Sequence, residues 1–275
     1  MQQQKVTLSL FRFSVTANRW WAFGMMGKAP GLIRELPGSP FAKMMGSGGG
    51  SGFSIFPNLG IYCLIHAAPA AAPPAPVQTR FIASPSSDFQ DSDPMQDQTR
   101  LTPPPAQTQL IPPPAQTRSI ASLQAKCAEH LTLHLQPIKS DGKWDGTNPF
   151  QSDPDFDPAG RPIAILTRAT IRPSRLIRFW RSVPNSSEMI LRQPGHLFSI
   201  GVGELPLIQQ ATFSLWENLD AVKRYAYREG PHKKVVQQTR KYDWYSEELF
   251  ARFVVTGMEG TWGGLEKTLA ASLQQ

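Results

Sequence analysis

Strand-like and helix-like hydrophobic patterns follow one another along the chain in an order that occurs twice. In the second half, alternation typical of a strand covers residues 162–171, and helical spacing of apolar positions follows at 175–183, after Ser174 as a candidate N-cap. Further patterns predict a short helix at 187–192, strands at 197–202 and 209–216, helices at 219–228 and 232–241, and a strand at 250–256. Strand–helix–strand–strand–helix–strand is the order of a ferredoxin-like unit.

The first part of the chain shows the same order in a less regular form. Its predicted elements are a strand at 6–13, a helix at 19–26, strands beginning at 52 and at 59, a helix at 119–129 and a strand at 131–138. Phe53-Ser54-Ile55 also matches Phe198-Ser199-Ile200 in sequence. We therefore predict an α+β fold in which two fused ferredoxin-like (βαββαβ) units pack as an α+β barrel, because this arrangement buries both sheets.

A proline-rich segment interrupts the first unit. Residues 67–119 hold 12 of the 26 prolines, and Pro103-Pro104-Pro105-Ala106-Gln107-Thr108 recurs at 112–117. A segment of this composition buries too little apolar area to offset its ordering entropy, so we expect a disordered or extended insertion. The predicted organisation is residues 1–66 with 120–140 as the first unit, 67–119 as the insertion, 141–160 as a linker, 161–263 as the second unit and 264–275 as a tail.

Composition and charge limit the classes of protein and partner. The 275 residues are 40% hydrophobic, enough for a sizeable core, but no run approaches the roughly 20 apolar residues of a membrane helix. The start of the chain lacks the order of a secretory signal, so we expect a cytoplasmic protein with at most peripheral membrane contact. The formal charge is +7, and residues 161–245 hold 14 Lys and Arg against 6 Asp and Glu. Without a nucleic-acid motif, this basic surface favours an anionic membrane or an acidic electron-transfer partner, or is simply a solvated face.

A set of segments in order along the chain carries a family resemblance. They are residues 6–13, 18–24, 43–46, 52–53, 57–58, 166–170, 212–216, 230–232 and 247–253. Together they are similar to the spheroidene monooxygenase family, over roughly residues 5–66 and 120–263, whereas the proline-rich insertion departs from the family pattern.

The resemblance implies an oxygenase that adds keto groups at C2 of acyclic carotenoids. Repeated hydroxylation of one carbon gives a gem-diol, which loses water to a ketone. Molecular oxygen is the implied co-substrate, and a ferredoxin is the implied electron donor. The family resemblance also implies a haem, for which the protein supplies an axial ligand, an apolar channel and oxygen access.

His232 is the leading candidate for an axial haem ligand. It follows Gly230-Pro231 at a predicted helix start, lies in a family-like segment, and has Glu229 nearby as a possible acceptor for its ring. A solvent-facing His in the first helical turn is the alternative. Arg168 lies in the middle of a predicted strand, where a buried guanidinium needs an anionic partner, such as a haem propionate, and where an outward-facing Arg is equally compatible.

The remaining His and Cys residues carry weaker indications. His196 precedes a predicted strand and is the second ligand candidate. His130 and His134 flank an alternating segment, so they lie on the polar side of a strand and not on one helix face like a zinc pair. Cys63 lies in an apolar strand, where a small buried residue is the simpler interpretation than a thiolate ligand. His66 carries no motif.

Aromatic and Met side chains gather in the first half and are suited to a polyene. We predict that Trp20, Trp21, Phe23, Met44 and Phe53 line a substrate channel, although helical spacing is equally typical of an ordinary core. The glycine-rich stretch at 46–52 lacks the ending of a phosphate-binding loop and favours a hinge or substrate lid. Two other functions remain open, a carotenoid or lipid carrier without catalysis and a cofactor-free monooxygenase of the same fold.

Overall fold

The chain folds around one closed sheet. The computed structural model describes residues 4–29, 33, 36, 39–49, 56–69, 118–182, 190–227 and 242–273. These residues belong to one compact unit, made of residues 1–70 and 117–275. Most of the predicted proline-rich insertion lies outside the described residues, as do the predicted helix at 232–241 and the glycine-rich stretch from residue 50 onward.

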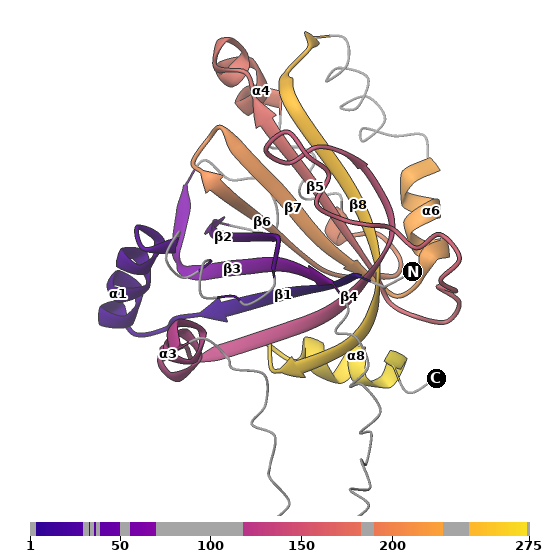
Figure 1. The fold of residues 1–275 in the computed structure, drawn as a ribbon, viewed down its shortest axis with the longest axis horizontal. Helices are drawn as coiled ribbons and strands as arrows, with labels where there is room; N and C mark the ends of the chain where they lie inside the picture. The colour runs from indigo at the N-terminus through magenta and orange to yellow at the C-terminus, as the bar shows by residue number, and fades with distance from the viewer. Residues whose placement is uncertain are drawn as a thin grey trace, which may run out of the picture. The chain divides into compact units, whose positions relative to one another are not determined.

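Eight strands form the sheet (Figure 1). They are β1 (Gln4–Arg12), β2 (Phe41–Gly48), β3 (Pro57–Pro69), β4 (Glu129–Gly142), β5 (Ile163–Ile171), β6 (His196–Leu205), β7 (Gln209–Trp216) and β8 (Tyr245–Gly260). Their order around the barrel is β1-β3-β2-β6-β7-β5-β8-β4, and β4 pairs with β1 to close it. Every pairing is antiparallel, and closure leaves no exposed sheet edge. The predicted α+β barrel is confirmed.

Each half contributes four neighbouring strands with the same connectivity. The first half has the spatial order β4-β1-β3-β2, and the second repeats it as β8-β5-β7-β6. The halves join where β2 pairs with β6 and where β4 pairs with β8. The long strand β8 has the most extensive pairing, because it spans the whole length of β5 on one side and most of β4 on the other.

Alternation along the strands separates an inward from an outward face. Inward side chains such as Leu8, Leu133, Leu166 and Phe213 are fully buried and belong to one continuous core inside the barrel. Trp144 and Phe150 also enter this core, although they come from the segment that we expected to be a linker. The interior is therefore filled by side chains.

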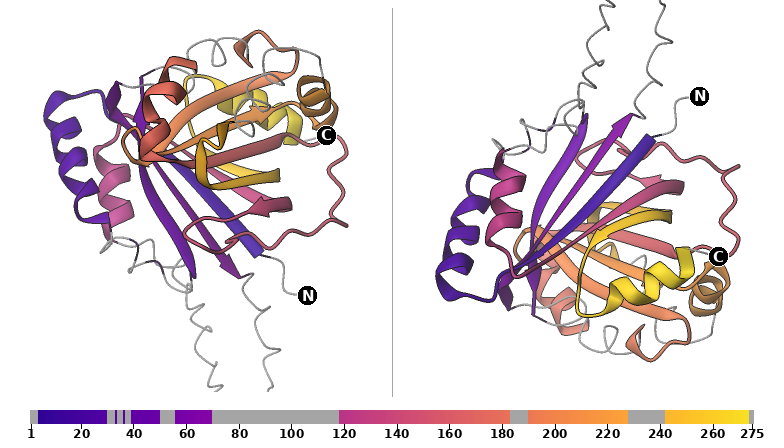
Figure 2. Two further views of the ribbon diagram at one scale, coloured as in Figure 1. Left: turned by 90° about the horizontal axis from the view of Figure 1, so that it is seen from above. Right: turned by 90° about the horizontal axis from the view of Figure 1, so that it is seen from below.

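Five helices cover the outside of the barrel within the described residues (Figure 2). They are α1 (Thr16–Met26), α3 (Arg118–Lys126), α4 (Leu176–Ser182), α6 (Leu219–Tyr227) and α8 (Leu265–Leu273). The helices α1 and α3 lie side by side on the outer face of the first half, while α4 and α6 belong to the second half. The C-terminal helix α8, in the segment expected to be a tail, inserts Leu269 into the main core.

Three local predictions need correction. A strand that was not predicted lies at Phe41–Gly48, so Gly46 and Gly48 are strand residues where we expected a hinge, while 52–55 lie outside the described residues. Ser174 is not the N-cap of α4 but lies inside a preceding 3-10 turn, η1 (Pro173–Arg175), which has no side-chain cap. The observed N-cap of this half is at α6, where the Asn218 side chain accepts a hydrogen bond from the Ala221 amide at 2.9 Å.

The helices also bear on membrane insertion. None of those in the described part of the chain has the length and apolar character needed to cross a bilayer.

Candidate functional site

Arg168 lies inside the barrel at the centre of a cluster of charges. It is on the inward face of β5 and only 1% exposed. Its Nη1 donates a hydrogen bond to Glu247 on β8, and its Nη2 lies 3.6 Å from carboxylate oxygens of both Asp145 and Glu204. Lys43 on β2 completes the cluster, pairing with Asp145 and lying 2.7 Å from the second oxygen of Glu204. The five residues, here called the interior charge cluster, thus come from both halves of the barrel.

A turn after β4 closes this end of the barrel over the cluster. Trp144 Nε1 donates to Glu204 at 2.8 Å, and the Arg168 guanidinium lies 5.4 Å from the centre of the indole ring. The backbone amides of Asp145 and Gly146 donate to Glu247 at 3.0 and 2.7 Å. Fixed donors and opposite charges surround the buried Arg168, while Asp145 remains half exposed, and such pairing is the condition under which a buried charge is tolerated.

Two pKa shifts confirm the direction of these interactions. Burial alone would raise the pKa of Glu247, but the amides of Gly146 and Asp145 and the Arg168 charge together lower it. Burial alone would lower the pKa of Lys43, but Asp145 and Glu204 raise it. Both groups are therefore held in their charged forms. An anionic cofactor group at Arg168 would have to compete with Glu247, so the propionate role stays a prediction.

A cavity lies where β6 begins and β8 ends. It has a volume of about 490 Å³, and its apolar walls are Leu197, Phe198, Trp262 and Leu265. Arg12 lines it too, with its guanidinium 4.3 Å from the centre of the Trp262 ring and its charge paired with Glu129. The backbone amide of Gly263 donates to the other oxygen of Glu129 at 3.0 Å, which ties the entry to α8 to the start of β4. This cavity can accept a short apolar segment but contains no unpaired titratable group among the described residues.

The described helices α4 and α6 cover only part of the outer face of the second half. A cluster around Ile163 and Trp216 packs under α6, and a second around Ile171 and Phe179 packs under α4. Between them Thr167 is exposed although it lies in the middle of β5. This gap in the apolar cover leaves a surface on which a ligand could lie.

Small residues form the floor of this gap. The register places Gly201, Thr212, Thr167 and Phe250 in one row across β6, β7, β5 and β8. Glycine in a strand interior permits close approach of a ligand or a neighbouring backbone. Arg252, one outward position beyond Phe250, lines an adjoining cavity of about 390 Å³ together with residues of 138–158 and Leu219. We call the Thr167, Thr212, Phe250 and Arg252 surface the open face. It suits a flat apolar ligand and presents no cluster of acid and base groups.

Among the described histidines, His196 has the side chain best placed to act as a metal ligand. Its Nε2 is buried without a hydrogen-bond partner among the described residues, and its ring packs edge-on against Trp216 at 5.3 Å. Burial lowers its pKa, although a hydrogen bond with the Phe198 backbone partly offsets this, so the imidazole is neutral near pH 7. His196 is not among the residues that line either cavity.

The other described histidines, His66, His130 and His134, lie on the outer face of the first half. His130 and His134 are on β4 and alternate with the buried Leu131 and Leu133, as predicted. His66 on β3 and His134 both pair with Thr7 of β1, and burial followed by the His134 charge lowers the pKa of His66. Within the described ranges, no group of three or more His, Cys, Asp or Glu side chains could hold a metal ion.

Comparison with known proteins finds relatives that align with nearly the whole chain. No family model matches the chain. A protein named spheroidene monooxygenase from Rhodobacter capsulatus is 31% identical over 270 residues, which cover 98% of this chain and 97% of that protein. One of the same name from Cereibacter sphaeroides is 35% identical over 264 residues, covering 95% and 69%. The chain belongs to the spheroidene monooxygenase family.

Solved structures add little to the spheroidene monooxygenase assignment. An aldoxime dehydratase bound to butyraldoxime is 12% identical with a TM-score of 0.49, covering 92% of this chain and 80% of that chain. A likeness of that degree carries no functional argument.

The residues predicted to line a channel in this spheroidene monooxygenase family member lie in different surroundings where the structure describes them. Trp20 and Phe23 are 61% and 50% exposed on α1, where their rings form an edge-to-face pair. Trp21 is half-buried and packs with the fully covered Met44 in the core under α1 and α3. None of these four lines the two cavities described above. Phe53 and His232 lie outside the described residues, so their roles stay predictions.

Sequence reasoning missed the partners of Arg168. Alternation could have located Glu247, since it is two residues before Leu249 and four before Ala251, which both point inward. Lys43 carried no such signal, because the strand that contains it was not predicted. Cys63 is buried as expected, and burial raises the pKa of its thiol far above the usual value, which disfavours a thiolate.

Proposed function

We propose that this protein is an oxygen-dependent monooxygenase that introduces keto groups at C2 of acyclic carotenoids. The observation that carries the proposal is the match, over nearly the whole chain, to proteins named spheroidene monooxygenase. Two successive hydroxylations of one methylene give a gem-diol that loses water to the ketone. Each hydroxylation places one atom of dioxygen on carbon and reduces the other to water, so electrons must come from a donor. A ferredoxin-type protein is the donor we propose.

We also propose that the two halves are fused ferredoxin-like units. What supports this is the repeated spatial order β4-β1-β3-β2 and β8-β5-β7-β6, with α1 and α3 on the outer face of one half and α4 and α6 on that of the other. In this arrangement the reaction site lies on the outer face of a sheet and not inside the barrel. The open face of the second half is the surface that fits a long, flat, apolar substrate.

The haem is proposed on the family resemblance alone. A haem needs only one protein ligand, and it supplies oxygen activation when bound. Among the described residues, His196 offers an unpartnered ring nitrogen but lines neither of the two cavities described above, so those cavities do not by themselves fit the group. His232 is the ligand we propose. No step of the reaction is assigned to the described side chains through a haem.

The test begins with the absorbance spectrum of protein purified from haem-supplied cells. We expect a Soret band that shifts on reduction and on carbon monoxide binding, and that is lost in His232→Ala but kept in the matched variant His134→Ala. Full haem occupancy in His232→Ala would exclude that ligand. Folded but colourless wild-type protein that still converts an acyclic carotenoid would point to a cofactor-free monooxygenase, and colourless protein that only binds the polyene would point to a carrier.

A further inference from the structure

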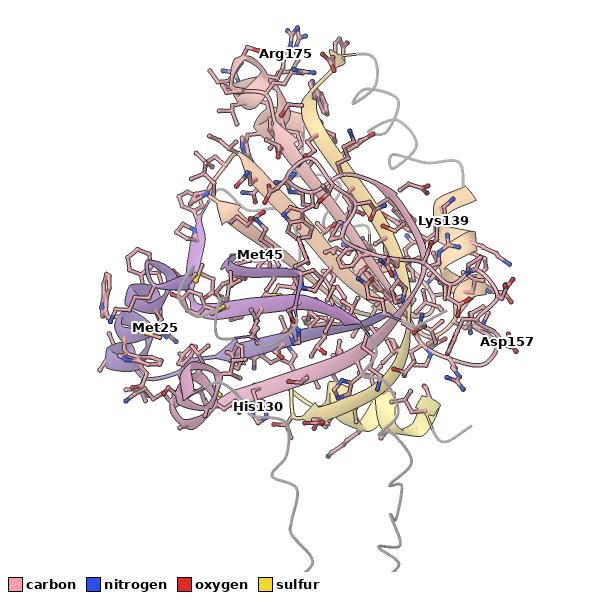
Figure 3. All side chains as sticks on the ribbon, viewed as in Figure 1. Met25, Met45, His130, Lys139, Asp157 and Arg175 are labelled. Carbon is pink, nitrogen blue, oxygen red and sulfur yellow. The ribbon has the colours of Figure 1, made fainter. Side chains whose placement is uncertain are left out.

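One end of the second half combines exposed arginines with exposed aliphatic side chains. We call this surface the α4 tip, and its residues are Arg175, Ile177, Arg178, Arg181, Leu205 and Leu207. Ile177, Leu205 and Leu207 are 71%, 48% and 38% exposed, among the largest values for apolar residues in the described chain. Arg175 projects from the outermost end of this half (Figure 3). Side chains of this kind usually pack inward, so their exposure together marks an interaction surface.

The α4 tip is rigidly attached to the barrel. Phe179 is 1% exposed and packs edge-on against Trp180 and Trp244, at ring-centre distances of 5.3 and 5.8 Å. Trp180 Nε1 donates a hydrogen bond to the Leu207 carbonyl at 3.1 Å, which joins α4 to the β6–β7 turn. The aromatic face of α4 therefore fixes the helix, and Ile177 is left on the opposite, solvent side.

Leu207 is in a backbone conformation that its side chain does not favour. Its φ is 68°, in the left-handed region where glycine or asparagine is the usual residue. A bulky side chain in such a turn is strained, and the hydrogen bond from Trp180 Nε1 to the Leu207 carbonyl helps to hold the turn.

Arginines dominate the charge around the tip, and the exposed Asp243 lies beside them in an ion pair with Arg172. No Asp or Glu occurs in the sequence between Asp157 and Glu188, whereas Arg161, 168, 172, 175, 178 and 181 all fall there. Of these, Arg172 pairs with Asp243 at 3.1 Å and Arg168 is inside the barrel, so neither contributes to the tip. The guanidinium of Arg178 lies 4.7 Å from the ring centre of Tyr242, which holds it at the surface. The described part of the tip thus presents cations next to aliphatic side chains.

We propose that the α4 tip docks on the surface of an anionic lipid bilayer. Guanidinium groups bind lipid phosphates as planar forks, and adjacent aliphatic side chains enter the boundary between headgroups and acyl chains. An acidic protein would match the charge as well, and the test below includes it as an outcome. The proposal stands on the surface alone and goes beyond the proposed reaction. It also explains how a protein without a described membrane-spanning helix could reach a lipid-soluble substrate.

The test is flotation of the full-length protein with vesicles of phosphatidylcholine, with and without phosphatidylglycerol. We expect binding to the anionic vesicles only, weakened by salt. Each basic residue near an anionic surface strengthens binding about fivefold, so Arg175→Gln/Arg181→Gln should reduce partitioning about 25-fold. Arg224→Gln/Lys267→Gln removes the same charge from exposed positions elsewhere and should bind nearly as well as the wild type. Ile177→Ser should weaken binding without changing its salt dependence.

Three outcomes would overturn the proposal. They are equal flotation of the wild type and the two α4-tip variants, equal binding to neutral vesicles, and loss of binding in both double variants alike. If the wild type does not float but Arg175→Gln/Arg181→Gln slows reduction by an acidic ferredoxin, the tip is an electron-donor site and not a lipid site. Circular dichroism checks each variant, and haem content is read separately, so failure of the oxygenase proposal remains distinguishable.

Discussion

The two halves of the barrel share their strand order but differ in how their outer faces are covered. In the first half, Phe11, Phe13, Tyr62 and Leu64 are all buried under α1 and α3 in one apolar cluster. In the second half, two separate clusters leave Thr167 exposed between them. The same connectivity thus produces a closed structural face on one side and an open face on the other. Within the described residues, this difference is why we propose the second half as the ligand-binding side.

Both halves depend on the interior charge cluster, whose loss should give the largest effect. Arg168→Ala removes the ion pair of the half-buried Glu247 and the longer contact with Glu204, whose nearer cation is Lys43, and we expect it to cost about 1–3 kcal/mol of unfolding free energy. Urea denaturation measures this, with the exposed Arg224→Ala as control at less than about 0.5 kcal/mol. If Arg168→Ala instead keeps its stability but releases haem, the propionate role is correct and the structural role is secondary.

A bulky residue on the open face should lower the activity, whereas a bulky residue on the outer face of the first half should not. Thr167→Trp fills the gap between the two clusters, and we expect kcat/KM for an acyclic carotenoid to fall at least tenfold, or about 1.4 kcal/mol, with the melting temperature unchanged. The control is Lys5→Trp, at an exposed outward position of β1 in the first half. Equal loss in both variants, or none in Thr167→Trp, would remove the functional distinction between the faces.

The smallest expected effect is a pH dependence at the barrel end. The pKa of Glu247 in the folded protein is below its usual value. Its ionised form therefore stabilises the fold at pH values above the usual carboxyl pKa, and this contribution is lost as the pH falls through the lowered pKa. Glu247→Gln should be less stable than the wild type at neutral pH, and the gap should narrow in acid. Thermal unfolding between neutral and acid pH measures this. A constant gap would show that the charge of Glu247 does not contribute.

Much of the fold was accessible from local patterns. Alternation located β1, β3, β5 and β7 to within a few residues, because one face of each of these strands meets a filled interior. Alternation failed for β2. In this strand Lys43 points inward to the interior charge cluster, and the apolar Met44 points outward to the core under α1. Binary patterning cannot identify a strand with a buried charge on one face and a packed helix on the other.

The sequence by itself determined the class of fold, the repeated order of elements, and the family through an ordered set of short segments. These depend on local periodicity and residue identity. Only the tertiary structure decided that Arg168 meets Glu247, Glu204 and Lys43, and that Thr167 is left uncovered. These contacts depend on strand register and barrel closure between positions far apart in the chain, for which no local pattern carries a signal.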